Sequence, residues 1–163
     1  MTRKVWTLAG VALAGSLAAC AGDAQPGEGA VELGTGEWEF VPLADEQPVE
    51  LVFGVQGGYH VWTSFRAEGL DPEDVMLEIE TQPADESLPP ERSRVPVDFD
   101  THDAMAEFLG WPAILSQPGC VANRQLLRIR VTLTDRSGVH ASDERYVQPL
   151  AGTGTPPPPD CAP

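Results

Sequence analysis

The chain has almost no lysine. Its only lysine is Lys4, near the N-terminus, and every other basic residue is an arginine. A lysine that forms a Schiff base or acts as a general base is therefore excluded from most of the chain. Lysine and arginine together number 10 against 25 aspartates and glutamates, so the formal net charge is −15. A protein this acidic is a poor binder of nucleic acid and is repelled by anionic lipid head groups.

Motifs of the common enzyme classes are also missing. The chain contains no G-x-S-x-G or S-x-x-K nucleophile motif, no H-E-x-x-H metal motif, and no Walker or G-x-G-x-x-G nucleotide loop. These absences predict a protein that is not an enzyme and carries no cofactor. A hydrolase of unknown type is left as an alternative, because a Ser-His-Asp arrangement can assemble from residues that are distant in sequence.

The N-terminus has the organisation of a secretory leader. Arg3 and Lys4 precede an apolar run from Val5 to Ala14 that is too short to remain as a membrane-spanning helix. The leader ends in Leu17-Ala18-Ala19-Cys20. This ending resembles the lipobox of bacterial lipoproteins, whereas an ordinary secretory signal needs no cysteine at this place.

The resemblance covers only residues 1–20, and it implies both processing and location. Residues 1–19 are a signal peptide that is cleaved, and the Cys20 thiol then carries the lipid, with palmitate-like acyl chains. Two or three acyl chains anchor a protein firmly, since each buried methylene contributes about 0.8 kcal/mol. Ala21, rather than Asp, after the cysteine implies the outer membrane. The expected location is therefore the bacterial cell envelope, on a periplasmic or surface face.

If Cys20 carries lipid, two cysteines remain. Cys120 and Cys161 form an even pair in an oxidising compartment, so we expect a disulfide between them. The bond closes a loop of about 42 residues and contributes on the order of 4 kcal/mol in the chain-entropy model. No C-x-x-C motif or Cys/His cluster indicates a redox or zinc site.

Composition divides the remaining chain into three segments. Residues 20–36 are rich in Gly, Ala and Glu and predict a flexible tether that spans roughly 20 Å. Residues 37–150 carry the apolar residues and predict one globular domain. Residues 151–163 include Pro156–Pro159 and predict an extended tail.

Alternation of polar and apolar residues predicts about seven short strands in this domain. They are expected at 37–41, 49–55, 59–67, 75–80, 94–99, 125–134 and 139–148. One short crossover helix is expected between Asp100, a good N-cap, and Leu109. This pattern predicts an all-β, antiparallel two-sheet sandwich. It resembles immunoglobulin-like and fibronectin-like domains in periodicity only.

The third expected strand contains the most unusual residues. If Val61 and Phe65 face inward, His60, Trp62 and Arg66 line the outer face of this strand and form a possible binding stripe. In the opposite register Trp62 belongs to the core, and His60 is a partly buried histidine. Both registers are compatible with the sequence.

Two groups of residues are candidates for a metal site. Asp98, Asp100, His102 and Asp103 group carboxylates with an imidazole, as calcium or copper sites do. Asp100 and Asp103 also serve as caps of the expected helix. The second candidate is a pair of His60 and His140, which requires that the two lie side by side.

Together these observations predict a membrane-anchored envelope lipoprotein with a non-enzymatic binding or structural role. Its expected partners are the membrane, through the N-terminal lipid, and an envelope protein or glycan, but no nucleic acid. The alternatives are an envelope protein that binds calcium or copper and a hydrolase of unknown type.

Overall fold

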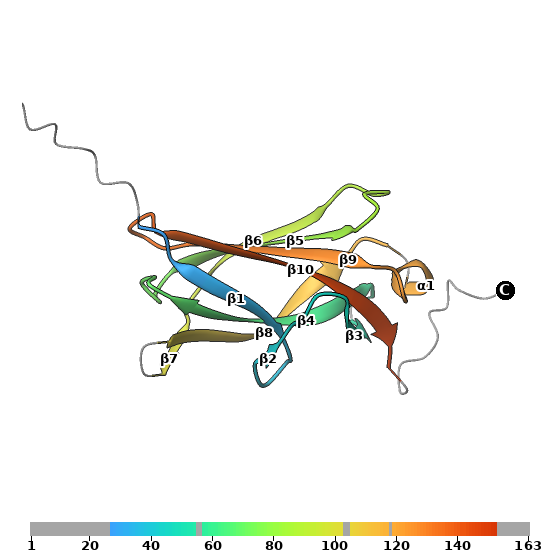
Figure 1. Cartoon of the computed structure of the whole chain (residues 1–163), viewed down its shortest axis with the longest axis horizontal. Helices are drawn as coiled ribbons and strands as arrows, with labels where there is room; N and C mark the ends of the chain where they lie inside the picture. Colours follow the sequence, from blue (N-terminus) through green and yellow to red (C-terminus); the bar gives the residue numbers. More distant parts are fainter. Residues whose placement is uncertain (1–26, 55–56, 103–104, 118, 153–163) are drawn as a thin grey trace, which may run out of the picture.

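The computed structural model describes residues 27–54, 57–102, 105–117 and 119–152, without the side chains of Cys120 and Val121 (Figure 1). The expected signal peptide, Cys20 and the tail 153–163 lie outside the described residues. The expected disulfide also lies outside them, because it joins Cys161 to a side chain that is not described. The described part of the chain contains no apolar helix of membrane-spanning length.

The regular structure of the described residues is β-strand apart from one short helical turn, which confirms the all-β class. The strands are β1 (Ala30–Thr35), β2 (Val41–Pro42), β3 (Gln47–Phe53), β4 (Tyr59–Glu68), β5 (Val75–Pro83), β6 (Glu91–Val97), β7 (Asp100–His102), β8 (Met105–Leu115), β9 (Leu127–Thr134) and β10 (His140–Ala151). A one-turn helix, α1 (Gly119–Ala122), lies between β8 and β9.

The strands form one continuous sheet in the order β2-β1-β4-β3-β10-β9-β5-β6, and β8 pairs with both β4 and β7. Figure 1 shows β5, β6, β9 and β10 along one side of the molecule and β4, β7 and β8 along the other. Strand β3 joins the two sides, since its first residues pair with β10 and its last residues pair with β4.

The core lies between the two sides and is built from alternate residues of the strands. Strand β9 buries Leu127, Ile129, Val131 and Leu133, and β5 buries Val75, Leu77 and Ile79, as the period-two pattern predicts. The arginines and glutamates between them point outward. The longest periodic segments of the sequence therefore supply one wall of the core.

The predicted helix at 100–109 is wrong. Asp100–His102 and Met105–Leu115 are two antiparallel strands, β7 and β8, and β8 extends beyond Leu109, where the expected helix ended. The apolar residues of this segment pack against β4, with Phe65 of β4 opposite Phe108. The spacing of the apolar residues supports only one turn of helix, which is hardly stable by itself. Pairing along the full length of β4 stabilises the segment more, and the segment is therefore a strand.

The predicted domain start at residue 37 is also wrong. Ala30–Thr35, expected to be part of the tether, forms β1 and pairs with β4, and Leu33 is completely buried. Of the expected first strand at 37–41, only Val41 is in a strand, the two-residue β2. The sheet is mixed rather than purely antiparallel, because β3 and β10 run parallel.

Candidate functional site

The register of β4 decides which of its residues face outward. Val61, Phe65 and Ala67 belong to the buried core. His60 and Trp62 consequently lie on the other face of the strand. This arrangement matches the first of the two registers considered from the sequence, although it does not by itself establish a binding role.

His60 and Trp62 line a pocket where the end of β3, the first half of β4 and the end of β8 meet. Its volume is about 380 Å³, and its lining is Val52, Phe53, Gly54, Gly57, Gly58, Tyr59, His60, Trp62, Pro112 and Ile114. Phe53 and Ile114 are 45% and 46% exposed, a high fraction for large apolar side chains. We call this site the Trp62 pocket. Its volume falls at the lower end of the range found for small-molecule sites.

The imidazole of His60 packs edge-on against the indole of Trp62, with ring centroids 4.6 Å apart. His60 is 8% exposed, and its Nε2 has no hydrogen-bond partner among the described residues. Burial lowers the pKa of His60, and the negative charge of Glu37 opposes this shift only in part. His60 is therefore an uncharged, polar group in the wall of an apolar pocket.

Trp62 lies where the neighbour of β4 changes. On one edge of β4, β8 pairs along Tyr59–Ala67. On the other edge, β1 pairs from Ser64 onward and β3 pairs only with Tyr59 and His60. The Trp62 carbonyl lies in the gap between them and accepts a hydrogen bond from Thr35 Oγ1 at 2.7 Å.

The segment after β1 is held against β4 next to Trp62. Ser64 Oγ donates a hydrogen bond to the Gly36 carbonyl and accepts one from the Gly110 amide. Gly110 has φ +69°, and a β-carbon there would lie 2.5 Å from the Glu37 carbonyl oxygen. Only glycine allows this close approach. Gly36 and Glu37 are thus fixed in place over the middle of β4.

Arg66, the third residue of the possible binding stripe, does not line the pocket. Its guanidinium donates to Glu107 at 2.7 Å and lies 4.2 Å from the centre of the Phe40 ring. Both contacts already satisfy its charge. The structure therefore brings His60 and Trp62 together and places Arg66 in a separate cluster.

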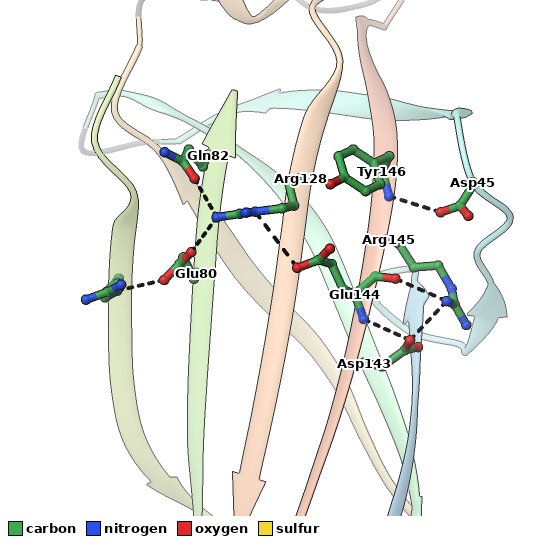
Figure 2. A network of polar contacts seen from close by, with 9 residues as sticks. Asp45, Glu80, Gln82, Arg128, Asp143, Glu144, Arg145 and Tyr146 are labelled. Carbon is green, nitrogen blue, oxygen red and sulfur yellow. Dashed lines mark hydrogen bonds and ion pairs between the residues drawn. The ribbon is translucent and has the colours of Figure 1, made fainter. Parts of the chain in front are cut away.

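The opposite face of the molecule is covered with paired charges (Figure 2). Arg128 of β9 contacts Glu80 and Gln82 of β5 and approaches Glu144 of β10, and Arg92 binds the other oxygen of Glu80. Burial opposes the ionisation of Glu80, but the two arginines outweigh it, so the pKa of Glu80 is lowered. The charges on this face largely satisfy one another, which is typical of a solvated sheet surface.

The metal candidates do not form a cluster. No three His, Cys, Asp or Glu side chains within the described ranges lie close enough together to hold a metal ion. Asp98 accepts a hydrogen bond from the Asp74 amide, Asp100 and His102 are exposed on β7, and Asp103 lies outside those ranges. His60 pairs with Val52 of β3, next to the point where β3 pairs with the last residue of β10. His140 is the first residue of that 12-residue strand, so the two histidines are not side by side.

Sequence reasoning missed Phe53, Pro112 and Ile114 as members of the site. Phe53 belongs to the expected second strand, but the alternation Val49, Leu51, Phe53 places it on the buried face. Pro112 and Ile114 lie outside all of the expected strands and the expected helix. The one available signal is Pro112 within an apolar run, since proline in a sheet marks an edge strand such as β8.

Comparison with known proteins finds no family model and no curated protein that matches this chain.

Proposed function

We propose that this protein is a bacterial lipoprotein, anchored to the cell envelope through Cys20, and that its domain binds an apolar group of an envelope partner in the Trp62 pocket. The role is binding, without catalysis. The observation that carries the proposal is the pocket itself, in which apolar side chains from three strands remain open to solvent.

The surroundings of the pocket support this function. Soluble proteins usually bury large apolar side chains or scatter them singly, and a contiguous open group is typical of an interaction site. Here Phe53, Trp62 and Ile114 meet in one hollow of a strongly acidic protein. They lie on paired strands, so the site needs little rearrangement to bind. The lipid would then keep this site near the membrane while leaving it free to face a partner.

We also propose that the domain is a two-sheet sandwich of the immunoglobulin-like type. Two layers of mainly antiparallel strands around one core support this architecture. Strand β3, which pairs with both layers, closes one side.

The binding function is tested with a neutral probe whose fluorescence rises in apolar surroundings, N-phenyl-1-naphthylamine. The protein is the mature chain from residue 20 with Cys20→Ser, which prevents acylation. At about 0.3–0.4 kcal/mol per heavy atom, the expected dissociation constant is on the order of 10–100 µM. Trp62→Ala and Phe53→Ser should each weaken binding by about tenfold, since each removes part of the pocket wall.

The matched control is Trp38→Ala. Trp38 is 82% exposed and does not line the pocket, so this variant loses an equally large aromatic side chain elsewhere. It should bind the probe as the parent protein does. If the probe does not bind saturably, or if Trp38→Ala weakens binding as much as Trp62→Ala, the proposed pocket function is wrong.

A further inference from the structure

Trp62 forms part of two adjoining hollows. One is the apolar Trp62 pocket. The other, about 300 Å³ in volume, is lined by Thr35, Gly36, Glu37, Pro48, Val49, Glu50 and Trp62. We call it the acidic hollow, because the described residues that line it include two carboxylates and no basic side chain. The indole of Trp62 thus separates an apolar surface from an acidic one.

The acidic hollow is constructed by specific contacts. Thr35 Oγ1 bonds to the Trp62 carbonyl, and Ser64 Oγ bonds to the Gly36 carbonyl, so Glu37 follows a segment that is tied to β4 at two points. Glu50 lies on β3 between Val49 and Leu51, which are both buried in the core. The backbone at both carboxylates is therefore held in place next to Trp62.

Both carboxylates are unpaired in the described part of the chain. Neither Glu37 nor Glu50 belongs to any of its ion pairs, and no arginine lines either hollow. The imidazole of His60 packs against Trp62. It adds no positive charge to the site near neutral pH, because burial lowers the pKa of His60. An aromatic face flanked by unpaired carboxylates attracts a cation.

We propose that the two hollows together bind an amphiphilic cation, a ligand with an apolar body and an ammonium or guanidinium group. The apolar body lies in the Trp62 pocket against Phe53 and Ile114. The cationic group lies over Trp62 between Glu37 and Glu50. A basic side chain next to an apolar one on an envelope partner has this chemistry, and a small aryl amine reproduces it as a probe.

This proposal rests on the proposed function, because the apolar body uses the same pocket. It adds a charge preference that a purely apolar pocket does not have. The charge preference can therefore be measured separately, with ligands that share one ring and differ only in the polar group.

The experiment uses naphthalen-1-ylmethylamine, naphthalen-1-ylmethanol and naphthalen-1-ylacetate, which are cationic, neutral and anionic. Dissociation constants are measured from the indole N–H signal of Trp62, assigned with Trp62→Phe. The amine should bind about fivefold more tightly than the alcohol, as expected for a cation over an indole with carboxylates nearby. The acetate should bind most weakly.

The double variant Glu37→Gln and Glu50→Gln should bind the alcohol as before but lose the preference for the amine. The control, Glu28→Gln and Glu68→Gln, removes the same charge just before β1 and at the far end of β4. It should keep the preference. Higher salt should reduce the preference in the parent protein.

Three results would overturn the inference. They are equal affinities for the amine and the alcohol, a preference that survives in the Glu37/Glu50 variant, and a preference that the control variant loses equally. If the alcohol still binds in these cases and Trp62→Ala weakens it, the pocket function stands without the charge preference. If the alcohol does not bind at all, the pocket function fails as well.

Discussion

His60 lies with its imidazole against Trp62 and almost entirely out of water. A buried imidazole without a hydrogen-bond partner at Nε2, within the described residues, reduces stability. Such a cost is more often accepted at binding sites than in ordinary cores. We therefore expect the free energy of unfolding to depend on the protonation of His60 and on whether a ligand fills the pocket.

The pH dependence follows from the lowered pKa of His60. In the unfolded chain its pKa is about 6.5. As pH falls below that value, the unfolded state takes up a proton that the folded state does not, so the free energy of unfolding decreases. Between pH 7.5 and 5.5, urea unfolding should show a larger loss of stability for the parent protein than for His60→Gln. Carboxylates titrate in both proteins, so the difference between the two losses reports on His60.

The control for this measurement is His140→Gln, since His140 is exposed at the start of β10. It should lose as much stability as the parent protein. If His60→Gln loses as much stability between pH 7.5 and 5.5 as the parent protein does, the imidazole of His60 is not buried in its uncharged form.

Arg128 and Arg136 allow a comparison of two ion pairs in one molecule. The Arg128 side chain is 22% exposed and contacts three polar side chains, whereas Arg136 is 50% exposed and binds Glu73, which is 76% exposed. Arg128→Met should reduce the free energy of unfolding by about 1–2 kcal/mol, because it leaves Glu80 and Gln82 without this partner. Arg136→Met should change it by less than about 0.5 kcal/mol. Thermal or urea unfolding of both variants measures the difference, and equal effects would contradict this account.

At the scale of the elements, β8 is shaped by a bulge next to the pocket. Thr63 pairs with Trp111 and Phe65 with Phe108, so the single residue Ser64 lies opposite two residues of β8. Gly110 is one of them. Its left-handed backbone lets β8 approach the segment that carries Glu37.

Gly110→Ala should therefore reduce the free energy of unfolding by about 2–4 kcal/mol, from backbone strain and the clash with the Glu37 carbonyl. Gly138→Ala is the matched control, because Gly138 also has positive φ (+85°) but a β-carbon there meets nothing within 4 Å. It should cost about 1 kcal/mol, the strain alone. If the two variants lose equal stability in urea unfolding, the close contact with Glu37 contributes nothing.

The sequence predicted those elements whose side chains alternate over a long segment. Strands β5 and β9 lie close to where they were expected, because buried and more exposed residues alternate along β9 and along the first six residues of β5. In β8, Met105, Phe108 and Leu109 have the spacing of one helical face, and the bulge shifts the phase of the strand alternation between Phe108 and Trp111, so no uninterrupted period-two pattern runs through the segment. Local periodicity cannot reveal a bulge that depends on pairing with β4.

The start of the domain was missed for a related reason. β1 contains only Val31 and Leu33 as large apolar residues, and its place is fixed by distant partners, such as Asp143, which accepts a hydrogen bond from the Leu33 amide. For the site, the sequence identified His60 and Trp62 by their residue types. Phe53 and Ile114 join them only through the sheet order.

At the scale of the whole molecule, the lipid anchor and the disulfide are tested by intact mass. For protein purified from its native membrane, we expect a mass that starts at Cys20 and includes two or three acyl chains. Alkylation should add mass only after reduction, since Cys120 and Cys161 are expected to be bonded. Cys20→Ser should release the protein from the membrane fraction. A lipid-free mass, or alkylation of two thiols without reduction, would contradict the respective prediction.

The measurement that tests the central claim most directly is a map of probe binding over the whole domain. Backbone and indole N–H signals of the ¹⁵N-labelled protein are recorded while the neutral probe is added. We expect saturable shifts concentrated at Phe53, Trp62 and Ile114, with the charged face around Arg128 unaffected. Saturable shifts centred elsewhere, or uniform shifts that do not saturate, would show that the Trp62 pocket is not a binding site.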